Sequence, residues 1–469
     1  MFQVLRRVRL ELFDRTGLSQ GQVKTLYLMI YCAMGGFSFG AITGGVVFTG
    51  FIKRLGASDF LYGVLIALPM LANSFQSFAS AALEKWRNRR LLFMVAGLTQ
   101  RAVWLPIGLL PLIPGISGGA RMATVAALVA MSAAAVPFMN VTLISIFSDV
   151  VPLRIRGRYF AVRYRMVTLV SLAFGLIAGR LIDVLPGFGG YALAFSIASV
   201  LGGADIVCFL FMDIPPMDSQ GPRRGMFRML REVLRDGNYM RLVAFGALWY
   251  FGVFLASPYF NVYMGSVLNL SYTFIMVSGL VVANIATFFF VTRWGAAYDR
   301  FGTHPVLVLN VLLGSLVPLI WIFVQPGMIW PIIAANVLSG AQWPAFEIGV
   351  QNLFMGLAPD RGRSMYTAVY FIGSQLLGAA LGSAAGGWLL DNALPAVEAL
   401  GISFAGGSLT KYHYVFVLSG LVRLIAAAVL PTVREAGSAP LREVTARLRE
   451  RIARPLPRRR TTREDSNGQ

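Results

Sequence analysis

Charged residues are scarce in this sequence, and acidic residues are the scarcer sign. Only 13% of the 469 residues are charged, 57% are hydrophobic, and the mean hydropathy is +0.67. A soluble chain of this length needs more polar residues to cover its surface, which excludes an ordinary globular protein. The composition predicts an integral membrane protein instead.

Cysteine and histidine are nearly absent. Cys32 and Cys208 both fall inside apolar runs, and His304 and His413 are far apart. This usage excludes a disulfide framework and a spaced zinc site. The sequence also lacks a Walker motif and a nucleophile–base constellation, so we expect neither ATP use nor enzymatic chemistry. No cofactor and no metal are expected.

Long hydrophobic runs are abundant. About 20 apolar residues cross the roughly 30 Å hydrocarbon layer, and twelve runs reach that length. They lie near 23–50, 59–80, 91–113, 121–147, 164–185, 190–212, 241–264, 271–293, 305–325, 328–356, 366–391 and 413–433. The predicted domains are a cytoplasmic N-terminal segment (1–22), a six-helix bundle (23–212), a cytoplasmic linker (213–240), a second six-helix bundle (241–433) and a basic cytoplasmic tail (434–469).

Basic residues are distributed unevenly between the two faces that these spans define. Of the 41 Lys and Arg, 34 fall in segments on the side of the N-terminus and four in segments on the other side. Such enrichment predicts that both termini are cytoplasmic. It also explains the net charge of +20 without nucleic acid as a partner.

The second half of the chain repeats features of the first. The stretch GAAYDRFGTHPVL (295–307) aligns with SAALEKWRNRRLL (80–92), which places Asp299 opposite Glu84. PFMNVTLISIFSDVVP (137–152) aligns with PAFEIGVQNLFMGLAP (344–359), and AGRLID (178–183) aligns with GGWLLD (386–391). The constant order predicts two six-helix units in the same orientation, which is a transporter architecture.

Over residues 1–433 the chain resembles the major facilitator superfamily. The family's loop signature is a glycine, then Asp-Arg four residues later, then a glycine–basic turn. It stands here as Gly295, Asp299, Arg300, Gly302 and His304. The first-half copy departs from it, with Ser80, Glu84 and Arg87 at the corresponding positions. The resemblance implies an all-α membrane protein, with twelve transmembrane helices in two pseudo-symmetric bundles.

The resemblance also implies a cytoplasmic latch that holds the two halves together in the outward-facing state. Asp299 would bridge to the first half near the fifth span, and Glu84 to the second half near the eleventh. A carboxylate is favoured near a helix N-terminus and beside arginine. The residues expected at the latch are Gly295, Asp299, Arg300, Gly302, Glu84, Lys85, Arg156, Gly157, Arg158, Arg361, Gly362 and Arg363. Alternatively, these residues serve only as topology signals.

Polar residues inside the spans are candidates for substrate or proton contact, because charge is costly in a bilayer. One helix face of the tenth span carries Asn336, Gly340, Trp343, Glu347 and Gln351. The resemblance implies that the first, fourth, seventh and tenth spans line a central cavity. Glu347 could carry a proton there, or pair with an Arg or the backbone; its first-half counterpart is Asn140. Arg101 could bind an anionic substrate or pair with a carboxylate such as Glu347.

Four further charged residues are expected to have structural roles. Asp205 and Arg423 lie at equivalent places in the sixth and twelfth spans, which are peripheral in the family. Arg180 and Asp183, three residues apart on one helix, are expected to pair with each other.

These features predict a monomeric, bacterial-type inner-membrane secondary transporter. It would move a small solute by alternating access, coupled to protons, although a uniporter is a further alternative. An exporter of amphipathic drugs or lipids would be favoured by a wide cavity rich in Met and Phe. A non-transporting membrane sensor on the same fold is the second alternative. The expected partners are a small-molecule substrate, the bilayer and protons or another coupling ion, and no pattern selects one solute class.

Overall fold

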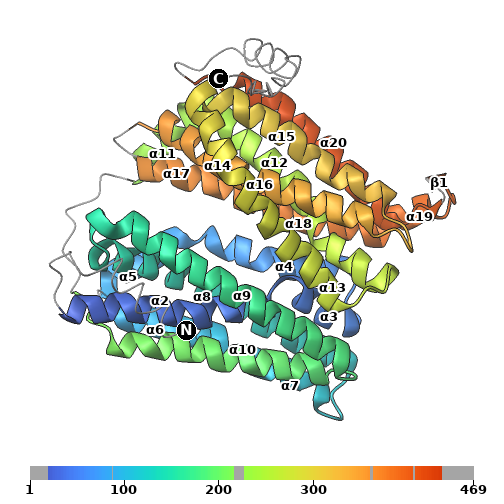
Figure 1. The fold of residues 1–469 in the computed structure, drawn as a ribbon, viewed down its shortest axis with the longest axis horizontal. Coiled ribbons are helices and arrows are strands. Elements are labelled where there is room, and N and C mark those ends of the chain that lie inside the picture. The colour runs from blue at the N-terminus through green and yellow to red at the C-terminus, as the bar shows by residue number, and fades with distance from the viewer. Residues whose placement is uncertain (1–19, 87, 216–225, 360–362, 405–406, 436–469) are drawn as a thin grey trace, which may run out of the picture.

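The computed structural model describes residues 20–86, 88–215, 226–359, 363–404 and 407–435. These residues are almost entirely helical. The described strands are β1 (Ser403–Phe404) and β2 (Gly407–Ser408), which pair antiparallel. Figure 1 shows the long helices in two bundles, with α2 to α10 in the lower one and α12 to α20 in the upper one.

The described part of the first half consists of α-helices and short 3-10 turns. In chain order the helices are α2 (Gln20–Thr43), α3 (Gly45–Arg54), α4 (Asp59–Asn73), α5 (Gln76–Trp86), α6 (Arg89–Ala102), α7 (Trp104–Leu109), α8 (Gly118–Val150), α9 (Arg156–Val184) and α10 (Gly189–Val207). The turns are η1 (Leu110–Leu112), η2 (Leu153–Ile155) and η3 (Cys208–Phe211).

The second half follows α11 (Met226–Arg235). Its α-helices are α12 (Gly237–Val262), α13 (Tyr272–Met276), α14 (Ala283–Phe301), α15 (Thr303–Ile320), α16 (Trp330–Leu357), α17 (Arg363–Phe371), α18 (Leu381–Trp388), α19 (Leu394–Glu398) and α20 (Lys411–Val429). The π-helical segments are η4 (Tyr263–Val267), η5 (Val277–Val282), η7 (Ile372–Ala380) and η8 (Leu389–Ala393), and the 3-10 turns are η6 (Trp321–Phe323) and η9 (Leu430–Thr432).

The predicted spans all fall on described helices. Among the described residues, ten helical stretches are long and apolar enough to cross a membrane, and α4 with α5, which are bent by 48°, form an eleventh. The segment expected at 328–356 is α16, a 28-residue helix that is long enough to cross a membrane but less apolar than the other spans. Its polar side chains, among them Gln342, Glu347 and Gln351, lower the hydropathy of a helix that is long enough to span.

Polar caps mark where several helices begin. The side chains of Ser58, Ser117 and Ser271 accept hydrogen bonds from the backbone N–H groups of Leu61, Ala120 and Phe274. Such caps satisfy one of the N–H groups that a helix leaves without a partner in its first turn. The first span contains a break between α2 and α3, where Gly45 has φ of +49°, a conformation that favours glycine.

The two bundles pack together at one end of the molecule. At that end, the buried residues of both halves form one apolar cluster, which joins Phe51 and Phe195 to Tyr259 and Phe416. At the other end, the buried residues form two separate clusters, one in each half, and Met70 of α4 also packs against the cluster of the second half. We call the first the closed end. It carries α3, α7, α13 and α19, at the right of Figure 1. The second, where α2 begins and η9 ends, is the termini end.

Candidate functional site

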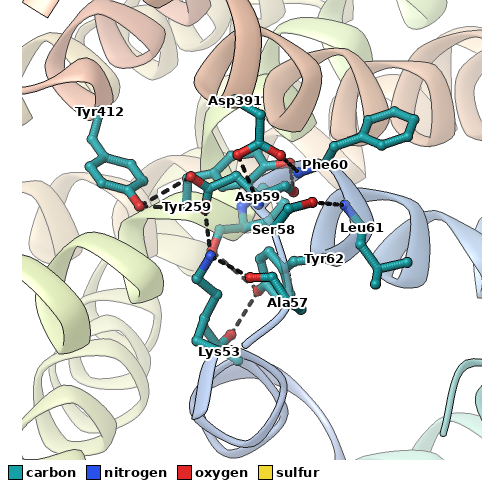
Figure 2. Close-up of polar contacts among 12 residues, drawn as sticks. Lys53, Ala57, Ser58, Asp59, Phe60, Leu61, Tyr62, Tyr259, Asp391 and Tyr412 are labelled. Carbon is teal, nitrogen blue, oxygen red and sulfur yellow. Dashed lines mark hydrogen bonds and ion pairs between the residues drawn. The ribbon is translucent and has the colours of Figure 1, made fainter. Parts of the chain in front are cut away.

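The closed end contains an ionic cluster around Asp59, at the start of α4 (Figure 2). The Asp59 carboxylate is 2% exposed. It pairs with Lys53 Nζ at 2.9 Å from its own half and with Lys411 Nζ at 2.7 Å from the other half. The Tyr412 hydroxyl donates to the same carboxylate at 3.3 Å. Two cations and a hydroxyl thus surround one buried carboxylate at the boundary between the halves.

A second carboxylate crosses the boundary at the same place. Asp391, in η8, accepts hydrogen bonds from the backbone N–H of Asp59 at 3.1 Å and of Phe60 at 2.7 Å. These N–H groups belong to the first turn of α4 and have no partner within their own helix. The partial positive charge of a helix N-terminus also attracts a carboxylate. Asp391 therefore ties the second half to α4 of the first (Figure 2).

The reverse contact is made by Asp183, at the end of α9. Its carboxylate accepts from the N–H groups of Tyr272 and Thr273, both at 2.8 Å, and from the Thr273 hydroxyl at 2.6 Å. Asp183 therefore bonds to α13 of the other half. The prediction that it pairs with Arg180 is wrong. The carboxylate is satisfied by two N–H groups of the first turn of α13, which have no partner within their own helix, and by the Thr273 hydroxyl.

Asp183 and Asp391 are the last residues of the aligned segments AGRLID and GGWLLD. Each half therefore uses the same residue of its repeat to cap a helix of the opposite half. Hydroxyl contacts reinforce the boundary beside them. The Ser383 hydroxyl donates to Gly63 O at 2.8 Å, and the Tyr62 hydroxyl donates to Pro258 O at 3.2 Å.

A cavity of about 850 Å³ lies between the halves. Its walls come from α2, α6, α8, α9 and α10 of the first half and from α12, α13, η5 and α14 of the second. Asn140 of α8, a predicted contact residue, is on the wall and donates to Asn73 at 3.5 Å. Most of the other wall residues are apolar, with Met and Phe prominent among them.

One wall of the cavity contains an ion pair. Arg101 Nη2 lies 3.2 Å from Asp205 Oδ2, and both side chains are less than a tenth exposed. Arg101 therefore pairs with Asp205, and the alternative pairing with Glu347 is not what the structure shows. The backbones of two glycines make room for the pair. A Cβ on Gly36 would lie 2.4 Å from Asp205 Oδ2, and one on Gly202 would lie 2.6 Å from Arg101 Cγ.

Arg163 is a further cation on the cavity wall. The charge count along the sequence placed Arg163 in the basic cytoplasmic segment that precedes the predicted span 164–185. In the structure it lies two turns inside α9. Its guanidinium carbon lies 5.0 Å from the centre of the Phe147 ring and 5.5 Å from that of Phe37. No signal in the sequence distinguished Arg163 from the neighbouring Arg158 and Arg165, because packing alone decides which side of α9 faces the cavity.

The stripe on α16 lies away from this cavity wall. The Glu347 carboxylate accepts a hydrogen bond from the Tyr250 hydroxyl at 3.3 Å, and the Trp343 ring packs on Phe346. Gly340 packs against the backbone of Ala283. Asn336, Trp343, Glu347 and Gln351 are not among the lining residues of the 850 Å³ cavity. Their contact with substrate or protons remains a prediction.

The latch residues lie at the termini end. Asp299 and Arg300 are exposed at the end of α14, and Gly302 has φ of +83° between α14 and α15. Arg156 donates to the carbonyl groups of Ser148 and Val151 within its own half. The remaining latch residues on described segments are Gly295, Glu84, Lys85, Gly157, Arg158 and, at the start of α17, Arg363. Arg361 and Gly362 lie outside the described residues.

Arg423 is buried in the second half. It donates to the carbonyl groups of Gly314 at 3.1 Å and Val253 at 3.5 Å, and it lies over the Trp249 ring. These contacts agree with the structural role that was expected. Asp205, its counterpart, is different because it lies on the cavity wall.

Comparison with known proteins agrees with this architecture. The sequence model described as Major Facilitator Superfamily matches residues 26–383. No curated protein gives a significant sequence match. A bacterial homologue of the human lysosomal transporter Spinster, solved in an inward-facing, unoccupied conformation, superposes with a TM-score of 0.65 at 17% identity, covering 89% of this chain and 98% of that one.

Two further solved structures show the same fold. A mutant of the nucleoside transporter NupG gives a TM-score of 0.64 at 12% identity, covering 88% of this chain and 99% of that one. The inward-open xylose transporter XylE from E. coli gives 0.61 at 14% identity, covering 90% and 99%. The family match, the twofold repeat and the two helical bundles lead to one conclusion: this chain belongs to the major facilitator superfamily of transporters.

Proposed function

We propose that the protein is a secondary transporter that moves a small solute by alternating access, and that this structure is its state open at the termini end. The observation that carries the proposal is the one-sided packing of the halves. A single apolar core and the carboxylates of Asp59, Asp183 and Asp391 join them at the closed end. The cavity therefore has its exit toward the termini end, where the cores are separate.

We place the termini end in the cytoplasm of a cell with an inner membrane. The excess of Lys and Arg in the segments at this end supports that orientation. The state is then inward-facing, which is also the conformation named for the similar Spinster homologue and XylE structures.

Proton coupling is part of the proposal. Glu347 and Asp205 are the two carboxylates well inside the spans, and either could carry a proton between the faces. A structural neighbour described as a D-xylose-proton symporter has the same fold, at 14% identity and a TM-score of 0.62. Exchange of each carboxylate for its amide, with transport measured against an imposed pH gradient, distinguishes coupled transport from uniport.

The cavity wall favours a second candidate, the export of amphipathic compounds. Met29, Met139 and Met276 line the cavity together with Phe37, Phe93, Phe147 and Phe209. Methionine is unbranched and polarisable, so it adapts to apolar ligands of different shapes. The outcome of transport assays in right-side-out and inside-out vesicles decides between import and export.

Thiol accessibility tests directly the proposal that the protein rests open at the termini end. Ser171 lines the cavity, so a Ser171→Cys variant in a Cys32→Ala, Cys208→Ala background carries one thiol there. We expect a membrane-impermeant maleimide to label it much faster from the termini face than from the opposite face. Gly119→Cys, exposed near the start of α8, is the matched control that reacts from the opposite face. A rate at the opposite face that equals or exceeds the rate at the termini face would contradict the proposal that the protein rests in a state open at the termini end.

A further inference from the structure

The charges on the cavity wall do not cancel. Its charged lining residues, among those the structure describes, are Arg101, Arg163 and Asp205. The ion pair between Arg101 and Asp205 neutralises two of them. The third, Arg163, forms no ion pair with a described residue, so the wall carries one cation in excess.

Arg163 is held in a way that leaves its charge available. It lies against the faces of Phe37 and Phe147, which support the guanidinium by cation–π contact but supply no counter-charge. Its Nε atom is buried and, within the described part of the chain, has no hydrogen-bond partner. A buried donor without a partner costs free energy, so the described residues do not meet the full hydrogen-bonding capacity of this side chain. A guanidinium offers planar, paired donors that match a carboxylate, sulfonate or phosphate.

The neighbouring charges leave Arg163 as the anchoring group. Arg101 is already occupied by Asp205 at 3.2 Å and also contacts the Met139 sulfur at 3.0 Å. With one cation in excess on the wall, a second negative charge on the ligand would find no cation that is free to pair with it. A single negative charge on the ligand suits this arrangement best.

The rest of the wall selects the body of the ligand. The cavity volume of about 850 Å³ matches the size of drug-like ligands. Its apolar side chains would leave the many hydroxyl groups of a sugar without partners, which is unfavourable. The excess positive charge opposes lipophilic cations.

We propose that the cavity binds a monovalent organic anion with an apolar body, the anionic group on Arg163 and the body among the Met and Phe side chains. This rests on the proposed transport function and names its substrate class. It also selects, among amphipathic compounds, the anionic ones.

Matched probes test the charge requirement. Purified protein in neutral phosphatidylcholine nanodiscs is titrated with 2-naphthoate, 2-naphthamide, (2-naphthylmethyl)trimethylammonium and acetate. We expect 2-naphthoate to bind at least about tenfold more tightly than the other three, because only it combines the charge with the apolar body. Equal affinity for the amide or the cation, or no binding of 2-naphthoate, would overturn the proposal.

Variants of α9 test the residue. Arg163→Gln should weaken 2-naphthoate binding roughly tenfold to a hundredfold, the effect of losing a charged hydrogen bond. Arg163→Lys should retain part of the affinity, and Arg165→Gln, exposed two residues along the helix, should retain all of it. Unchanged affinity in Arg163→Gln would refute the assignment. Nanodiscs with phosphatidylglycerol then identify the source of the anion: competition indicates a lipid headgroup, and its absence a free solute.

The binding and labelling experiments test the two proposals independently. If the Ser171→Cys thiol is labelled faster from the termini face as expected but 2-naphthoate does not bind, the substrate class is wrong and the transporter proposal stands. If 2-naphthoate binds through Arg163 but the thiol is labelled at least as fast from the closed face, the assignment of the resting state is wrong and the substrate class stands.

Discussion

The carboxylate caps at the closed end provide the most direct test of how this transporter is held in its present state. Asp391 and Asp183 each accept backbone N–H groups from a helix of the opposite half. If these contacts stabilise the closed end, replacing either carboxylate with the neutral amide should favour opening there. Asp391→Asn and Asp183→Asn keep the side-chain shape and remove the charge.

The expected magnitude follows from what happens to both partners on opening. The N–H groups and the carboxylate become hydrated, so only the net interaction is lost. A carboxylate at a helix N-terminus contributes about 0.3–1 kcal/mol when exposed and up to about 2 kcal/mol when partly buried. Asp391 is half-buried and Asp183 is exposed. We therefore expect about 1–2 kcal/mol for Asp391→Asn, a factor of roughly 5–30 in the open population, and a smaller shift for Asp183→Asn.

The readout is the rate at which the cavity thiol of Ser171→Cys reacts with an impermeant maleimide added at the closed face. We expect Asp391→Asn to raise that rate by the factor above, Asp183→Asn to raise it less, and the double variant to combine both effects. An unchanged rate in Asp391→Asn and in the double variant would show that these contacts do not control opening. Reversal of the order between the single variants would refute the argument from burial.

Three other results are expected. In the Asp391→Asn background, Asp299→Asn should slow labelling of the Ser171→Cys thiol from the closed face. The latch is expected to favour the outward-facing state, so its loss shifts the population back to the state that is closed at that face. Faster labelling would contradict the latch. Arg101→Met alone should destabilise the purified protein by about 3–5 kcal/mol, because it leaves Asp205 buried and unpaired, whereas Arg101→Met with Asp205→Leu should restore much of the loss. Additive losses in the melting temperature would refute that coupling. Gly340→Ala should lower the melting temperature by an amount that corresponds to about 1–3 kcal/mol, since its Cβ would lie 2.2 Å from a backbone oxygen of the neighbouring segment; an unchanged value would refute the close packing.

The helical membrane fold was predictable from the sequence because its causes are local. Apolar runs of sufficient length become helices wherever their backbone polar groups must be satisfied internally. The alignment of AGRLID with GGWLLD and of the two loop motifs revealed the repeat without any structure. The composition alone excluded most other classes, since few charged residues were available to cover a soluble surface.

The partners of individual charges were not predictable in the same way. Arg101, Asp205 and Asp183 were all identified as unusual, yet the first two were not paired with each other and the third was paired with a neighbour on its own helix. Ion pairs between spans depend on the rotation of each helix about its axis and on which helices are adjacent. Neither quantity is encoded in the order of residues along one span.

The sequence by itself determined that this chain is a twofold-repeated, all-helical membrane protein with sided charge, because periodicity, length and composition act within each segment. Only the tertiary structure decided that the two halves exchange carboxylate caps at one end, that Asp205 pairs with Arg101, and that Arg163 faces the cavity without an ion-pair contact among the described residues. These features arise where side chains distant in sequence meet across an interface. Their energies depend on distance and burial, which exist only once the helices have packed.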